Sequence, residues 1–288
     1  MKPFVYIAAR SIPEAVSALR DSAGPVRILA GGTDLLLEWR RPGAPMPGTV
    51  VDISRVDGLD GVARDGDEIL LGPLVTHAGL ARSEVIRSAA PLLAASAASI
   101  GSPQIRNRGT LGGNIMNAAA CADTVPPLLA LGAAVTLTSA GGARACSLAE
   151  FFTGAYATVA RPDEMLTQVR FPALPSGARS AFVKLGRRNA LSISRLSVAA
   201  VVTTDDEGLI ADARIVPGAV FAVWKRIADA ERLLTGKAPA TPLFAEAGRA
   251  VADTMIRETG RRWSTEYKEP VIAALVRRAL EQCFAVSD

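Results

Sequence analysis

The sequence predicts an α+β protein made of three units: a small mixed α/β unit, a larger α+β unit, and a C-terminal α+β unit with a small antiparallel sheet beside helices. Three observations support this prediction. Short apolar runs alternate with amphipathic stretches over residues 1–55. A second such series ends at Pro175-Ser176-Gly177, a composition typical of a linker. The remainder begins with strand-like runs and ends with helix-like stretches, so we place the units at residues 1–55, 56–175 and 176–288.

In the first unit we expect the order β-α-β-α-β. Ser11 precedes an amphipathic stretch and is expected to cap the first helix. Thr33 or Asp34 is expected to cap the second helix, which follows Gly31-Gly32. The expected strands are residues 4–8, 26–30 and 50–53.

The second unit is expected to begin with a meander and to continue through helices into two further strands. A polar loop at 101–110 leads into a glycine-rich turn at Leu111-Gly112-Gly113-Asn114, and residues 139–143 are expected to form a second turn. The expected strands are residues 58–64, 68–72, 134–138 and 166–171. The expected helices are residues 76–81, 91–100 and 123–130.

The third unit has three apolar runs that predict an antiparallel sheet, followed by three amphipathic stretches that predict helices. The expected strands are residues 181–186, 194–203 and 210–217. The expected helices are residues 224–234, 243–254 and 269–284. No internal repeat is found along the chain.

The composition excludes several function classes. Hydrophobic residues make up 49% of the 288 residues and charged residues 21%, so each unit can bury a packed core. Aromatic residues are only 5%, which argues against a surface that stacks single-stranded bases. The balance of 32 Lys and Arg against 28 Asp and Glu predicts neither nucleic acid nor an anionic membrane as a partner.

Targeting and membrane segments are also not predicted. The apolar run at residues 3–9 is too short for a signal peptide. No stretch of ~18 uncharged apolar residues is present that would span a membrane. We therefore expect a cytoplasmic protein.

The number and spacing of the cysteines and the single histidine limit which metal sites, disulfides and catalytic triads the chain can form. Cys121, Cys146 and Cys283 are far apart and form no C-x-x-C pair, so we expect no disulfide framework, zinc site or iron–sulfur site. His77 has no partner pattern around it for a metal site or a Ser-His-Asp triad, and we expect it in a turn or at the surface. The sequence therefore predicts no catalytic side chain and no metal ligand.

Residues 26–35 form the first glycine-rich motif, in which an apolar strand runs into Gly31-Gly32 and then into a helix start. Such a turn presents unpaired backbone N–H groups without a Cβ to hold a ligand away, and it suits a pyrophosphate. The motif is neither the G-x-G-x-x-G fingerprint nor a P-loop. An ordinary turn remains the alternative for this motif alone.

Residues 104–114 form the second glycine-rich motif, where Gly112 and Gly113 are expected to expose backbone donors. Asp123 follows and could accept hydrogen bonds from ribose hydroxyls. The alternative is an ordinary loop with a solvated arginine pair. Two such motifs in neighbouring units favour a dinucleotide bound between them. Side chains nearby that could add hydrogen bonds or positive charge are Thr110, Asn114, Asn117, Arg106 and Arg108.

Residues 30–36 and 104–115 resemble the two FAD motifs of the medium, flavin-binding subunit of molybdenum hydroxylases, the family of xanthine dehydrogenase and carbon monoxide dehydrogenase. The resemblance keeps its linear order over nearly the whole chain. It continues through residues 122–127, 151–154, 163–166, 171–172, 184–188, 267–268 and 277–280.

The resemblance implies a set of FAD-binding residues. Gly31, Gly32 and Thr33 would surround the pyrophosphate. Lys184 would lie near the ring system, where a cation stabilises negative charge on the reduced flavin; an exposed strand lysine is the alternative. The full implied set is Ile28, Leu29, Ala30, Gly31, Gly32, Thr33, Asp34, Ile100, Gly109, Thr110, Gly113, Asn114, Asn117, Ala122, Asp123, Leu166 and Lys184.

Two departures from the family pattern are visible. Residues 219–224 are Ala-Val-Phe-Ala-Val-Trp, where the family has an Ala-Pro-Thr-Pro-like stretch. The resemblance therefore does not predict the path of the backbone through this part of the third unit. The cysteine-rich insertion of the 4-hydroxybenzoyl-CoA reductase branch is absent, which argues against that branch. Cys121 lies inside the second motif region and is expected to be a small buried hydrophobic residue.

The resemblance implies an FAD-binding electron-transfer subunit. A small [2Fe–2S] subunit would deliver electrons from a large molybdopterin subunit that oxidises the substrate, and the acceptor would be NAD, a quinone or oxygen. A dimer of such heterotrimers is also implied. Noncovalent FAD is expected, since no histidine lies near either motif.

Two alternatives remain at this point. The first is a self-contained FAD oxidase or dehydrogenase of the vanillyl-alcohol-oxidase kind, which needs its own acid/base residues and often a histidine link to the flavin. His77 lies outside both motifs, which weakens this alternative. The second is a scaffold subunit with a degenerate flavin site, which the intact glycine pairs argue against.

Overall fold

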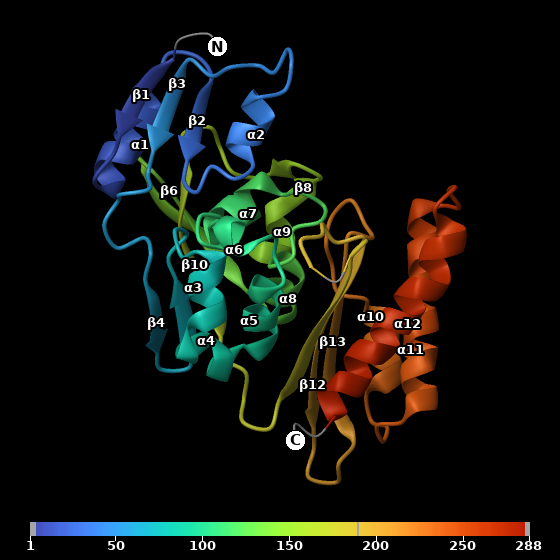
Figure 1. The fold of residues 1–288 in the computed structure, drawn as a ribbon. Coiled ribbons are helices and arrows are strands. Elements are labelled where there is room, and N and C mark those ends of the chain that lie inside the picture. The colour runs from blue at the N-terminus through green and yellow to red at the C-terminus, as the bar shows by residue number, and fades with distance from the viewer. Residues whose placement is uncertain (1–3, 189, 286–288) are drawn as a thin grey trace.

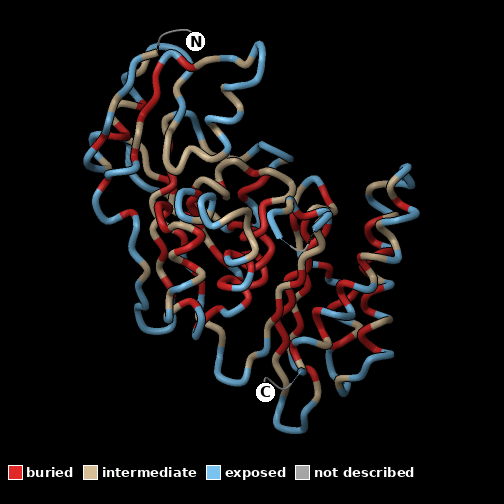
Figure 2. Tube along the Cα trace, in the orientation of Figure 1, coloured by how far each residue is buried: buried red, intermediate tan, exposed pale blue. Residues whose placement is uncertain are grey.

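The computed structural model describes residues 4–188 and 190–285, and it has the predicted α+β architecture (Figure 1). Each unit has its own hydrophobic core, and the core of the second unit also includes residues of the third, such as Ala199. Figure 2 shows buried backbone running through all three, with exposed residues at the hairpin ends and on the outer helices. No helix within these described residues is long and apolar enough to cross a membrane. The boundaries at residues 55 and 175 stay a prediction.

The first unit is a three-stranded parallel sheet in the order β1-β3-β2. Its elements are β1 (Val5–Ala8), α1 (Ile12–Asp21), β2 (Val26–Leu29), α2 (Leu35–Trp39) and β3 (Thr49–Asp52). The Ser11 side chain accepts a hydrogen bond from the Glu14 backbone, as the capping prediction requires. Asp34 precedes α2 but makes no side-chain cap. The sheet ends at Leu29, so Ala30–Asp34 form the connection that leaves it at its carboxyl edge.

The second unit is built on a five-stranded antiparallel sheet in the order β4-β5-β10-β6-β7. These strands are β4 (Val62–Asp65), β5 (Glu68–Leu71), β6 (Ala134–Ser139), β7 (Gly142–Ser147) and β10 (Met165–Pro172). The helices are α3 (His77–Arg82), α4 (Glu84–Ala89), α5 (Pro91–Ala98), α6 (Pro103–Arg106), α7 (Leu111–Asn117), α8 (Val125–Ala130) and α9 (Leu148–Phe151). A two-stranded pair, β8 (Phe152–Gly154) and β9 (Ala157–Thr158), completes the unit.

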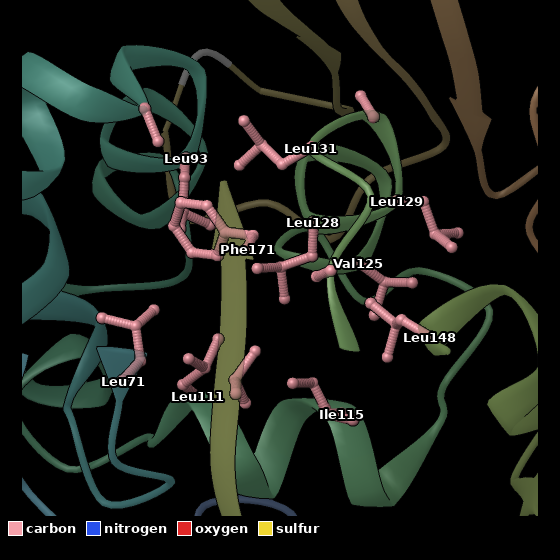
Figure 3. Close-up of a cluster of buried hydrophobic side chains, with 14 of the residues drawn as sticks. Leu71, Leu93, Leu111, Ile115, Val125, Leu128, Leu129, Leu131, Leu148 and Phe171 are labelled. Carbon is pink, nitrogen blue, oxygen red and sulfur yellow. The ribbon is translucent and has the colours of Figure 1, made fainter. Parts of the chain in front are cut away.

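The core of the second unit fixes the helices that carry the second glycine motif. Figure 3 shows Leu111 and Ile115 of α7 pointing into a cluster with Val125 and Leu128 of α8 and with Phe171 of β10. Leu111, Ile115, Val125 and Leu128 are fully buried. Burying such side chains contributes roughly 1.5–3 kcal/mol each, so α7 is anchored from its first residue.

The third unit has a three-stranded antiparallel sheet, β11 (Arg179–Leu185), β12 (Leu196–Thr204) and β13 (Ile210–Gly218). Helices α10 (Ala228–Leu234), α11 (Thr241–Thr259) and α12 (Thr265–Phe284) cover one face. Val198 and Ala200 of β12 belong to the core beneath these helices, whereas Ala199 and Val201 belong to the core of the second unit. Because both faces are covered, β12 reads as a continuous apolar run without alternation.

Several sequence predictions are corrected by the structure. β7 begins at Gly142, inside the expected turn, because a hairpin extends the sheet there. The expected loop at 101–110 contains α6, and α4 had no prediction. α10 begins at Ala228 rather than at Trp224, because Trp224 is buried against Phe152 with ring centroids 4.6 Å apart.

Candidate functional site

The connection after β2 presents a run of free backbone donors. Among the described residues, the amides of Gly31, Gly32, Thr33 and Asp34 donate no hydrogen bond to the protein. Gly32 has φ +74°, a left-handed conformation that favours glycine. Successive amides with one residue in this conformation form a concave anion-binding turn. The first motif therefore exposes backbone N–H groups as its sequence predicts, and binding of a pyrophosphate there stays a prediction.

Gly31 brings the two glycine motifs into contact. A Cβ built on Gly31 would lie 2.8 Å from the carbonyl carbon of Arg108, closer still to its oxygen, and 3.2 Å from the Cα of Gly109. No side chain can occupy that space. The backbone of the first unit therefore packs directly on the backbone of the second motif, which the sequence could only suggest.

The second motif differs from the predicted open turn. Residues 111–117 form α7, and the Thr110 side chain caps it by accepting from the Gly113 amide at 3.1 Å. The Gly112 amide donates to the Pro73 carbonyl at 2.8 Å. Gly112 and Gly113 thus expose no free donors, because both amides are used to seat the helix. The prediction that both glycines would expose free backbone N–H groups is wrong, whereas contact between Gly113 and the cofactor stays a prediction.

The segment that follows α7, residues 118–124, contacts α7, and its Cys121 senses the charge of Asp34 in the first motif. The Thr124 hydroxyl donates to the Asn114 side chain at 2.6 Å and holds the segment against α7. Burial chiefly raises the pKa of the Cys121 thiol, and the carboxylates of Asp123 and Asp34 raise it further. Asp34 of the first motif is therefore close to this segment. Cys121 is partly buried, whereas a buried position was expected.

Asp123 and Lys184 form a buried ion pair. The Lys184 ammonium on β11 donates to Asp123 Oδ2 at 2.7 Å and to the Ser99 carbonyl at 3.1 Å. The Ser194 hydroxyl donates to the other carboxylate oxygen, Oδ1, at 2.5 Å. The Lys184 side chain is 13% exposed, so the alternative of an exposed strand lysine is wrong. Burial raises the pKa of the Asp123 carboxyl, and the charge of Lys184 opposes that rise.

The remaining predicted residues lie on several elements, some of them next to the first motif or to the ion pair of Asp123 and Lys184. Ile28, Leu29 and Ala30 lead into the first motif along the partly buried end of β2. Ile100 follows Ser99 and its carbonyl accepts from Arg106 at 2.9 Å. Asn117 ends α7 and Ala122 precedes Asp123. Leu166 is buried in β10, in the same hydrophobic core as Leu111 of the second motif.

His77 is not a surface residue. It is the first residue of α3 and is 3% exposed, and its backbone amide donates to the Gly109 carbonyl at 3.0 Å. Within the described part of the chain its Nδ1 is buried and has no hydrogen-bond partner. Burial, aided by the charge of Arg106, lowers the pKa of His77 to about 4. The prediction of a turn or surface histidine is wrong because the helix start is covered by the second motif.

We expect a measurable pH effect from His77. The unfolded chain takes up a proton near pH 6.5, but the folded state does so only near pH 4, so stability falls as the pH drops through this window. The loss should reach about 3 kcal/mol. Because the chain has one histidine, a single imidazole signal in an NMR titration reports this pKa. A midpoint at or above 6.5 would contradict the prediction, and His77→Phe should remove the share of the pH dependence of unfolding that His77 contributes in this window.

Sequence reasoning missed two members of the site, Ser99 and Ser194. Their contacts with Lys184 and Asp123 span 85 and 71 residues of chain. Serine is common in loops and helix ends, so neither position carries a local signal. Only the packing of β11 against the second unit brings them to the ion pair.

Comparisons with known proteins agree with this arrangement. The family model described as the FAD binding domain in molybdopterin dehydrogenase matches residues 2–174. The family model described as the CO dehydrogenase flavoprotein C-terminal domain matches residues 180–283. The two matches meet in the segment that contains the expected linker.

Individual relatives match over nearly their full lengths. The chain is 34% identical to the 6-hydroxypseudooxynicotine dehydrogenase complex subunit alpha of Paenarthrobacter nicotinovorans, covering 97% of this chain and 95% of the relative. It is 30% identical to the carbon monoxide dehydrogenase medium chain of Afipia carboxidovorans, covering 98% and 97%. A solved carbon monoxide dehydrogenase chain from Hydrogenophaga pseudoflava superposes with a TM-score of 0.90 at 30% identity, covering 99% of both chains. These similarities favour a medium subunit over a self-contained oxidase.

Proposed function

This chain belongs to the family of FAD-binding medium subunits of molybdenum hydroxylases, and from that premise we propose that it relays electrons between iron–sulfur clusters and an external acceptor. The bound flavin supplies the redox chemistry. The side chains and backbone of this chain bind it, orient it and set its electrostatic surroundings.

One observation carries the proposal. The amides of residues 31–34 donate to no other described residue, and they lie where Gly31 packs on the backbone of Arg108 and Gly109. Free amides that converge at the junction of two units suit the pyrophosphate of a dinucleotide. We therefore assign the pyrophosphate to residues 31–34, with Gly109 and Thr110 beside it. The other members of the predicted set stay predictions.

Lys184 is the residue we assign to the ring system. Its ammonium lies at the buried junction between β11 and the second unit, where water is largely excluded. A cation in such a place stabilises negative charge more strongly than one in water. This placement fits a residue that favours the reduced cofactor.

The partners follow from the family. The names of the relatives designate them as subunits of complexes, such as "medium chain" and "complex subunit alpha". We propose a small [2Fe–2S] subunit as electron donor and a large molybdopterin subunit as the site of substrate oxidation, assembled as a dimer of heterotrimers. The acceptor would be NAD, a quinone or oxygen. We place this complex in the cytoplasm.

The first test is the identity and linkage of the cofactor. We expect the purified chain to carry one FAD that acid precipitation releases completely, because the only histidine is buried beneath Gly109 and cannot link to the ring. The supernatant should contain FAD and not FMN by chromatography. Colour that stays on the denatured protein would contradict noncovalent binding, and a colourless protein that takes up no FAD would contradict the proposed function.

A further inference from the structure

The Asp123 carboxylate is held on both of its oxygens. Lys184 Nζ donates to Oδ2 at 2.7 Å and Ser194 Oγ donates to Oδ1 at 2.5 Å. These donors come from β11 and from the segment just before β12, so one carboxylate joins the third unit to the second. An ionised carboxylate has about four acceptor positions, so acceptance from a ribose hydroxyl, the role that its position in the sequence suggested, stays a prediction.

This ion pair is more deeply buried than the others in the described part of the chain. The side chains of Lys184 and Asp123 are 13% and 7% exposed, and no other ion pair there has both partners below 15%. Charges attract more strongly where water is excluded. Removing one partner of such a pair leaves an uncompensated charge in the protein.

We propose that Asp123 is a positioning residue, which fixes the Lys184 ammonium and offsets its charge, and which thereby sets the reduction potential of the flavin. The inference rests on the proposed function, because it requires a flavin near Lys184. In this arrangement Ser194 supports the carboxylate from the other side. The balance between one positive and one negative charge then decides how strongly the site favours the reduced cofactor.

The expected shifts have opposite signs in two variants. Asp123→Asn keeps the shape of the side chain but removes its negative charge, so the uncompensated Lys184 should raise the flavin midpoint potential. Lys184→Met leaves the buried carboxylate without its counter-charge and should lower the potential, most clearly at alkaline pH, which favours the ionised carboxyl. We expect each change to alter the ratio of oxidised to reduced flavin at a fixed potential at least tenfold, which is about 30 mV for a two-electron couple. The double variant should return towards the wild type.

Glu164→Gln is the matched control. Glu164 is 4% exposed and its carboxylate accepts from Arg144 at 2.6 and 2.8 Å, but it shares no contact with Asp123 or Lys184 among the described residues. This variant should lower the thermal midpoint without moving the potential. Ser194→Ala keeps both charges, so it should shift the potential less than either charge variant.

The outcomes separate the inference from the proposed function. Spectroelectrochemistry on the FAD-loaded full chain gives the potential, and equilibrium titration gives the Kd for FAD. If Asp123→Asn leaves the potential unchanged, or abolishes FAD binding while the fold stays intact, the positioning role is overturned. If that variant does not fold, an unchanged potential in Lys184→Met overturns it instead. Absence of flavin binding in the wild type would contradict the proposed function itself.

Discussion

Gly31→Ala is expected to empty the cofactor site. The added Cβ would meet the Arg108 carbonyl group, with its carbon 2.8 Å away, and both partners are backbone. Backbone cannot rotate aside as a side chain can, so the first unit must move away from the second motif. We expect the Kd for FAD to rise at least 100-fold, which corresponds to about 2.7 kcal/mol. Fluorescence titration of the apoprotein with FAD measures this change.

Gly61→Ala is the matched control for Gly31→Ala. A Cβ on Gly61 meets no atom within 4 Å, and Gly61 does not have a positive φ. It should keep wild-type affinity and the thermal stabilisation that bound FAD adds. That stabilisation is about 2.7 kcal/mol when FAD is at 100 times its Kd, and Gly31→Ala should lose it. Full flavin occupancy in Gly31→Ala would refute the placement of the pyrophosphate.

Removing the flavin from the assembled complex is expected to abolish electron transfer to the external acceptor. Substrate should still reduce the molybdenum and iron–sulfur centres, because no acid/base pair or metal-ligand group is predicted in this chain for the substrate step. Rapid mixing of the deflavinated complex with substrate, with iron–sulfur bleaching as the signal, measures reduction of the clusters by substrate. Steady-state reduction of the acceptor measures electron transfer out of the complex.

Reconstitution with FAD is the control for the deflavinated complex, and it should restore acceptor reduction. If the iron–sulfur clusters no longer bleach although they and the molybdenum remain intact, the flavin subunit takes part in the substrate step and the relay proposal fails. Oxidation of a small organic substrate by the isolated chain would favour the self-contained oxidase instead.

Much of the fold could be predicted from local sequence. The apolar run that becomes β12, the cap at Ser11 and the glycine pair after β2 each depend on neighbouring residues, so their signals survive in a short window. The second glycine motif is a case in which prediction from neighbouring residues fails. Glycine pairs are typical of turns, but the Thr110 cap and the burial of Leu111 and Ile115 stabilise a helix there.

The prediction that His77 lies in a turn or at the surface failed for a related reason. A lone histidine without a partner pattern is usually exposed, and nothing within a few residues of His77 shows that Gly109 will cover it. Burial of a single side chain depends on the path of distant backbone. Exposure was therefore the least reliable property to predict for this residue.

The sequence by itself determined the fold class, the two glycine motifs and their order, and the resemblance that pointed to FAD. Tertiary structure alone decided that Gly31 packs on Arg108 and that Asp123 joins Lys184 and Ser194. Asp123 and Lys184 are 61 residues apart in the sequence, and Asp123 and Ser194 are 71 residues apart. Hydrophobic periodicity and capping act over one or two turns of chain, whereas such contacts depend on how three separate cores pack together. The elements of the site are therefore local, and the junction that makes them one site is not.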